Sequence, residues 1–139
     1  MTPDTQQHRD RKPDDAPASV VLLARDVDAP RLARQHVRSV ATRLRDERAT
    51  DAVLLVSELV TNAVKYGGDG AIELVIAQPS DRVRVAVRDP GGPGPLPEMR
   101  TPGPDGGGHG LRLVDEIADR WGVEHGSTIV WFEFDVANG

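Results

Sequence analysis

The sequence predicts an α+β fold, a two-layer α/β sandwich in which a mostly antiparallel mixed sheet is covered on one face by three helices. Two observations lead to this fold class. Three segments space their apolar residues as amphipathic helices do, but these segments do not alternate one-for-one with the β-prone runs, which argues against a doubly wound parallel sheet. Two neighbouring runs alternate with period two and are joined by turn residues, which indicates an antiparallel hairpin.

The first half of the chain predicts one strand and two helices. The run VVLLA (20–24) is short, apolar and bounded by charge, as a strand would be. Asp28 near the N-cap and Pro30 in the first turn predict a helix over 29–47. Its basic face is either a solvated surface or a docking surface for an acidic partner, and it consists of Arg31, Arg34, Arg38 and Arg45. His36 borders the apolar stripe of this helix, where packing is its expected role. A second helix is expected from about Thr50 to Tyr66, ended by Gly67 and Gly68.

The second half predicts a hairpin, a long loop, a helix and two further strands. The runs AIELVIA and RVRVAVRD flank the turn residues QPSD (78–81). Residues 90–108 then hold thirteen Gly or Pro in nineteen positions, far more than a compact connection needs. The amphipathic segment 111–121 predicts the third helix, and two β-prone runs around His125 and Gly126 close the chain.

Composition limits the classes of function. The formal charge of −5 argues against a general nucleic-acid binder, and the absence of cysteine excludes disulfides and thiolate metal sites. No apolar run approaches the ~20 residues of a membrane span and the N-terminus lacks a signal-peptide core, so a cytoplasmic protein is expected. Residues 1–18 are polar and charged, which predicts a disordered tail before one domain over 19–139.

A carboxylate and an amide share one face of the second predicted helix. Glu58 and Asn62 are four residues apart, so they lie about 40° apart around the helix axis. One interpretation is the solvated side of an amphipathic helix. The other is a site for hydrated Mg²⁺, which prefers a few protein oxygens together with substrate phosphates, while the carboxylate orients a nucleophile.

Asp89 closes an apolar strand. By the period-two rule it shares a face with Val85 and Val87, so its carboxylate should be buried and must find hydrogen-bond donors. Two sources remain open. Either the backbone N–H groups of the DPGG turn supply them, or a ligand amine does so in a pocket at the strand end, where Gly91 permits close approach.

The glycine-rich run GGGHGLRLV leads into the third predicted helix. Free backbone N–H groups at a helix start favour a bound phosphate. A flexible hinge is the alternative interpretation.

Four segments in order, SELVTNAVKYG, VRDPGG, GGHGLRLVDEIADRWG and TIVWFEF, resemble the GHKL (Bergerat-fold) ATPases, the ATP-binding domains of gyrase, Hsp90, histidine kinases and MutL. Within them the chain is most similar to the small stand-alone branch typified by the RsbW/SpoIIAB anti-sigma-factor serine kinases. The resemblance covers about residues 20 to 136.

The resemblance implies a role for each matching position. Asn62 would hold Mg²⁺, Glu58 would be the general base or orient water, and Asp89 would accept a hydrogen bond from the adenine amino group. Residues 90–108 would be the ATP lid. The remaining implied nucleotide-binding positions are Gly91, Gly108, His109, Gly110, Leu111 and Thr128.

The resemblance also implies an activity and partners. The expected protein binds ATP and Mg²⁺, phosphorylates Ser or Thr of an anti-anti-sigma (STAS-type) protein, and holds a sigma factor inactive. A homodimer is expected from the resemblance only. Two alternatives are a non-catalytic, nucleotide-dependent protein-binding module and a slow ATP hydrolase.

Three positions depart from the family pattern. Tyr66 stands where this branch has histidine, Pro93 where a third glycine is expected, and Ile129 where a threonine often precedes VW, with Thr128 just upstream. These departures concern the expected phosphotransfer. None of them removes Asp89 or Asn62.

Overall fold

Five antiparallel strands form one sheet in a computed structural model that describes residues 18–89, 110–124 and 129–136. The strand order is β1-β2-β3-β5-β4. The predicted lid and the positions Gly91, Gly108, His109 and Thr128 lie outside these ranges, as does nearly all of the predicted tail. In chain order the elements are β1 (Ser19–Leu23), α2 (Ala29–Val40), α3 (Asp46–Tyr66), β2 (Ile72–Ala77), β3 (Arg82–Arg88), α4 (Gly110–Ile117), β4 (Arg120–Glu124) and β5 (Ile129–Asp135).

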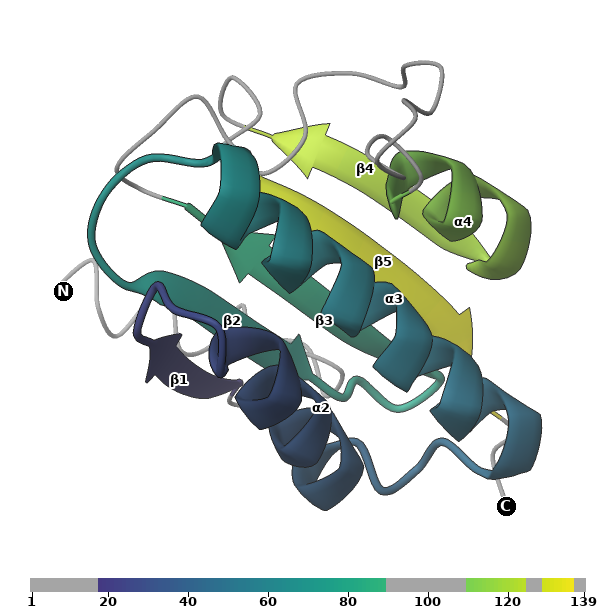
Figure 1. The fold of residues 1–139 in the computed structure, drawn as a ribbon. Helices are drawn as coiled ribbons and strands as arrows, with labels where there is room; N and C mark the ends of the chain where they lie inside the picture. Colours follow the sequence, from purple (N-terminus) through teal and green to yellow (C-terminus); the bar gives the residue numbers. More distant parts are fainter. Residues whose placement is uncertain (1–17, 90–109, 125–128, 137–139) are drawn as a thin grey trace, which may run out of the picture.

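The three helices lie on the same side of the sheet (Figure 1), which confirms the predicted α+β sandwich. Each pair of neighbouring strands is antiparallel, so no parallel pair occurs among the described residues. None of the helices in this part of the chain is long and apolar enough to cross a membrane.

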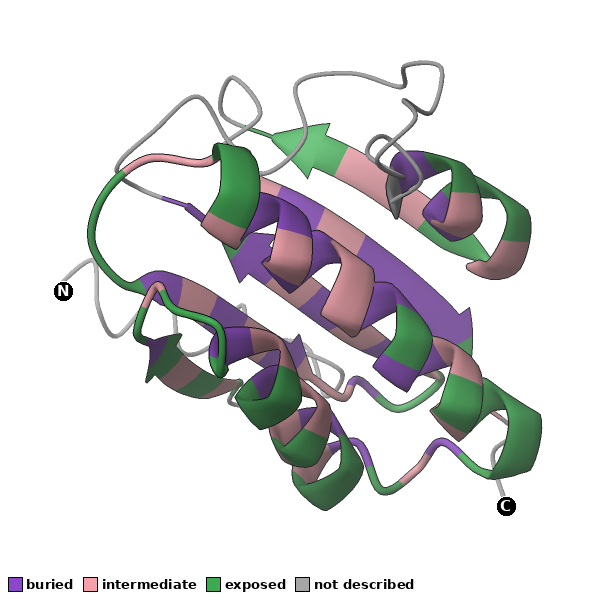
Figure 2. Ribbon diagram, viewed as in Figure 1, coloured by how far each residue is buried: buried purple, intermediate pink, exposed green. Residues whose placement is uncertain are grey.

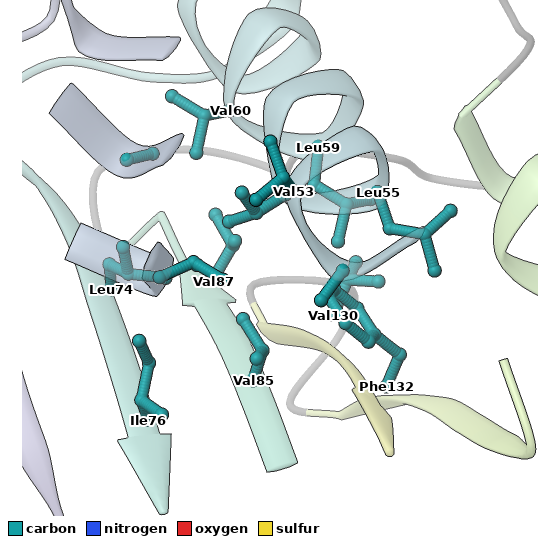
Figure 3. Close-up of a cluster of buried hydrophobic side chains, with 14 of the residues drawn as sticks. Val53, Leu55, Leu59, Val60, Leu74, Ile76, Val85, Val87, Val130 and Phe132 are labelled. Atoms are coloured by element: carbon teal, nitrogen blue, oxygen red, sulfur yellow. The ribbon is translucent and has the colours of Figure 1, made fainter. Parts of the chain in front are cut away.

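The core lies between α3 and the central strands. Alternate residues of β2, β3 and β5 point toward the helices and are buried, as the period-two pattern predicts. Figure 2 shows the buried residues gathered where sheet and helices face each other, and Figure 3 shows Leu59 and Val53 of α3 above Val87, Val130 and Phe132. This packing fixes α3 over the centre of the sheet.

The first two helices are divided differently from the prediction. α2 ends at Val40, not at residue 47, and α3 begins at Asp46, not near Thr50. Hydrogen bonds to the β2–β3 turn explain the break: Gln78 Nε2 donates to the Val40 carbonyl at 2.8 Å, and the Arg43 guanidinium donates to the carbonyls of residues 78–80. The linker is therefore tied to the sheet, and periodicity alone gives no sign of these contacts.

The third helix also ends early, at Ile117 and not at residue 121. The Asp119 N–H donates to the Glu133 carbonyl at 3.0 Å, which places the following residues in the sheet as β4. Trp121 lies in β4 and not in the helix, but its indole N–H donates to Asp115 Oδ1 of α4 at 2.9 Å. Pairing with β5 therefore overrides the helical periodicity.

His36 predicts a pH-dependent stability. Its ring is half-buried with Nε2 3.1 Å from Ser19 Oγ, which confirms a packing role, and burial lowers the pKa of the imidazole below 6.5. Below pH 6.5 the unfolded chain therefore binds a proton that the folded chain resists. The free energy of unfolding should fall as the pH drops from 7 through 6.5 to the lower folded value. Denaturant titrations should show a smaller fall in His36→Gln, and an equal fall in both proteins would contradict this.

Candidate functional site

Asp89 lies directly after β3 with no exposed surface, as its place in the apolar row predicts. Both of its oxygens accept hydrogen bonds. Arg25 donates from Nη2 to Oδ1 at 2.8 Å and from Nη1 to Oδ2 at 3.2 Å, and the Gly68 N–H donates to Oδ2 at 3.0 Å. Neither of these donors figured among the sources considered from the sequence.

Arg25 is a site residue that the sequence motifs miss. It also donates to three backbone carbonyls, from Nη1 to Ala63 at 2.6 Å, from Nε to Gly70 at 3.0 Å and from Nη2 to Asp69 at 3.4 Å. The guanidinium thus joins the end of β1, the last turns of α3, the loop after it and the end of β3.

Strand direction is the signal that could have revealed this pair. β1 and β3 both run antiparallel to β2, so their C-terminal ends lie at the same edge of the sheet. Leu23 pairs with Ile72, and Glu73 pairs with Arg88, so the residues that follow β1 and β3 come close together. An arginine after one such strand is a natural counter-ion for a buried aspartate after the other.

Gly67, which ends α3, touches the Asp89 carboxylate. A Cβ built on this glycine would lie 1.8 Å from Asp89 Oδ2 and 2.5 Å from the Ala63 carbonyl oxygen. The φ of Gly67 is −82°, so close approach and not backbone conformation requires glycine here. The end of the helix is thereby fixed against the end of β3.

We expect Gly67→Ala to lower the free energy of unfolding by about 1–3 kcal/mol, because the new methyl group overlaps a buried carboxylate and a backbone carbonyl. Urea unfolding measures the change. Gly70→Asn is the matched control, since a Cβ added there meets nothing within 4 Å and asparagine tolerates the positive φ of 85° better than other side chains do. Equal stability of Gly67→Ala and wild type would show that the close approach is relieved without cost.

Asn62 lies in α3, five residues before Gly67, and is 5% exposed. Burial shows that the solvated-face interpretation is wrong for this residue. Its Nδ2 has no hydrogen-bond partner among the described residues, and an unmatched buried amide costs about 1–3 kcal/mol. Nδ2 is a donor, so an oxygen-rich ligand could complete this position, whereas a cation would require the amide to turn by about 180° and present its oxygen.

Glu58 lies one turn before Asn62 and is half-buried. Within the described ranges no hydrogen bond or ion pair engages its carboxylate, which leaves both oxygens available. No cluster of three or more acidic or histidine side chains in these ranges could hold a metal ion.

The remaining predicted positions are described only in part. Gly110 and Leu111 begin α4, which packs against α3. Leu111 is 2% exposed and joins the core, so its backbone and not its side chain is available to a ligand. The described residues thus bring Asp89 to the end of the helix that carries Asn62 and Glu58.

The four arginines expected to form one face do not remain together. Arg34 donates to Ser57 Oγ of α3 at 2.8 Å, and Arg31 pairs with Asp28 at 3.5 Å. Arg45 lies beyond α2 and forms the N-cap position of α3, while Arg38 stays exposed on α2. The described positions therefore do not support a continuous basic docking face on this helix.

A hollow of about 470 Å³ lies elsewhere, on the face of the sheet opposite the helices. Its charged rim is internally paired, Arg84 with Glu124 at 3.2 Å and Arg88 with Glu73 at 3.6 Å. Because the charges of this hollow are matched within the chain, it is a weaker candidate site than the end of the sheet at Asp89.

Comparisons with known proteins bear on the family and the fold. The family described as the histidine kinase-like ATPase domain matches residues 23–134. The chain is also similar to a crystal structure of the RsbU and RsbW domains of a Mycobacterium tuberculosis protein, with a TM-score of 0.60 and 20% identity. That match covers 87% of this chain and 32% of the other, so this chain spans about a third of that structure. No curated protein matches the chain significantly.

Proposed function

The chain belongs to the histidine kinase-like ATPase domain family, and on this premise we propose that it binds ATP with Mg²⁺ and acts as a serine/threonine-protein kinase and anti-sigma factor. The observation that carries the nucleotide site is the unmatched buried Nδ2 of Asn62, on the helix whose end contacts the buried carboxylate of Asp89. Such convergent polar groups at the end of a strand are typical of a ligand site.

Each residue has a distinct part in this proposal. Asp89 accepts a hydrogen bond from the exocyclic amino group of adenine, and Asn62 binds Mg²⁺ through its amide oxygen. Glu58 orients the attacking hydroxyl of the substrate and accepts its proton, for which its unengaged carboxylate is suited. The γ-phosphoryl group of ATP would pass to that hydroxyl while ADP leaves, and a bound Mg²⁺ would offset the negative charge of the phosphates. Because phosphoryl transfer depends mainly on positioning, so few side chains are sufficient.

The proposed partners follow from the RsbW-like resemblance. The phosphate acceptor is a Ser or Thr of an anti-anti-sigma (STAS-type) protein, and the second partner is a sigma factor. The proposal places the protein in the cytoplasm as a homodimer.

Incubation with γ-labelled ATP, Mg²⁺ and a STAS-type protein tests the proposal. Label on the partner supports the kinase, whereas ATP binding without transfer or hydrolysis supports a protein-binding module. Phosphate release without the partner supports a slow hydrolase. Unchanged ATP affinity in Asp89→Asn would contradict the nucleotide site itself.

A further inference from the structure

Every N–H group of the Arg25 guanidinium donates a hydrogen bond within the site. Arginine has five N–H donors, and here each has an acceptor: two reach the oxygens of Asp89 and three reach backbone carbonyls. Only 15% of the side chain is exposed. Moving Arg25 would break all five hydrogen bonds together, so it is a fixed part of the site.

This arrangement limits what Asp89 can still bind. A carboxylate offers about four acceptor positions, two on each oxygen. The described donors fill both positions on Oδ2, through Arg25 Nη1 and the Gly68 N–H, and one position on Oδ1, through Arg25 Nη2. No donor from the described residues reaches the second position on Oδ1, so with respect to them one acceptor position remains there.

The charge of Asp89 is balanced by the same residue. Within the described ranges Arg25 provides the ion pair, at 2.8 Å. The other titratable side chains of the neighbouring elements form no hydrogen bond or ion pair with Asp89 there; they are Asp26 and Asp28 after β1, Lys65 and Tyr66 of α3, Asp69 of the following loop, Glu73 of β2 and Arg88 of β3. A ligand group at Oδ1 thus meets a carboxylate that already has its counter-ion.

We propose that Arg25 is a positioning residue for base selection, which holds both oxygens of Asp89 and leaves one acceptor position for a single neutral N–H donor. The inference rests on the proposed nucleotide site. Asp89 has no exposed surface, so the groups that cover Oδ1 must move apart when a base enters, while the Arg25 pair stays in place. An adenine amino group fits the remaining position, whereas the carbonyl of hypoxanthine would oppose the carboxylate.

The test compares the dissociation constants of Mg-ATP and Mg-ITP by calorimetry at neutral pH. Wild type should prefer ATP by about 10- to 100-fold, because ITP leaves a buried acceptor facing a carbonyl. In Arg25→Gln the preference should fall at least about tenfold, because a carboxylate released from its two-point contact no longer presents one fixed acceptor position.

Arg25→Lys is the matched variant, since it keeps the charge but cannot hold both oxygens. Its preference should fall at least about threefold, because one ammonium replaces a two-point contact. A purely structural role would weaken the binding of both nucleotides alike and leave the preference unchanged. Where circular dichroism shows that Arg25→Gln does not fold, Arg25→Lys decides alone.

The outcomes separate the two proposals. A wild-type protein that binds neither nucleotide contradicts the proposed function. A wild-type protein that prefers ATP, together with folded Arg25 variants whose preference equals that of wild type, overturns the role of Arg25 and leaves the nucleotide site intact.

Discussion

Replacing Arg25 by methionine should lower the free energy of unfolding by about 3 kcal/mol, because it leaves the Asp89 carboxylate buried without a counter-charge. The change also removes donors from the carbonyls of Ala63, Asp69 and Gly70, of which those of Asp69 and Gly70 lie at exposed contacts and regain water more easily. Urea unfolding at neutral pH, followed by circular dichroism, measures the loss.

A double variant separates the buried charge from the lost packing. Arg25→Met with Asp89→Leu leaves no lone ion in the interior, so it should recover part of the stability lost by Arg25→Met alone. Arg31→Met is the exposed control, since the Arg31–Asp28 pair is more than half exposed and should contribute less than about 1 kcal/mol. A double variant that is less stable than the single one would argue against an uncompensated charge as the cause.

Replacing Glu58 by glutamine should slow phosphoryl transfer to the partner by about 10²- to 10⁴-fold, the usual contribution of a general base. The amide retains the shape of the side chain but accepts a proton poorly. ATP affinity should stay close to that of wild type, because no part of the proposed nucleotide contact runs through Glu58. Single-turnover transfer of label, with calorimetry for affinity, measures the two effects separately.

The matched control is Glu47→Gln, which makes the same change at an exposed position in the first turn of the same helix. It should leave the transfer rate within about twofold of wild type, as surface substitutions away from a site usually do. Equal transfer rates in Glu58→Gln and Glu47→Gln would remove Glu58 from the mechanism. A wild type that binds ATP but transfers no phosphate would support the binding module instead.

Hydrophobic periodicity was sufficient to predict most of the fold. The alternation in β2 and β3 and the apolar stripe of α3 arise from burial against a single core, so each can be recognised locally. The boundaries of the helices could not be predicted in this way. The end of α2 depends on Gln78 and Arg43, whose contacts join segments more than thirty residues apart in the sequence.

The site shows the same division between local and distant information. The burial of Asp89 follows from its place in an alternating strand, and the position of Glu58 one turn before Asn62 follows from helical spacing. The ion pair with Arg25 depends on the order and direction of three strands, which no local pattern encodes. Glycine at position 67 was expected as a helix end, but its contact with the carboxylate emerges only in three dimensions.

The tight contact at Gly67 also sets a length scale in the molecule. A slide of α3 by one turn, about 5.4 Å along its axis, would drive a side chain into the space that the Asp89 carboxylate occupies. The separation between the Asn62 amide and this carboxylate is therefore a constant of the fold. A molecule that contacts both groups at once must match that separation. Under the proposed function, this part of the fold would therefore select ligands by their length as well as by the chemistry at each end.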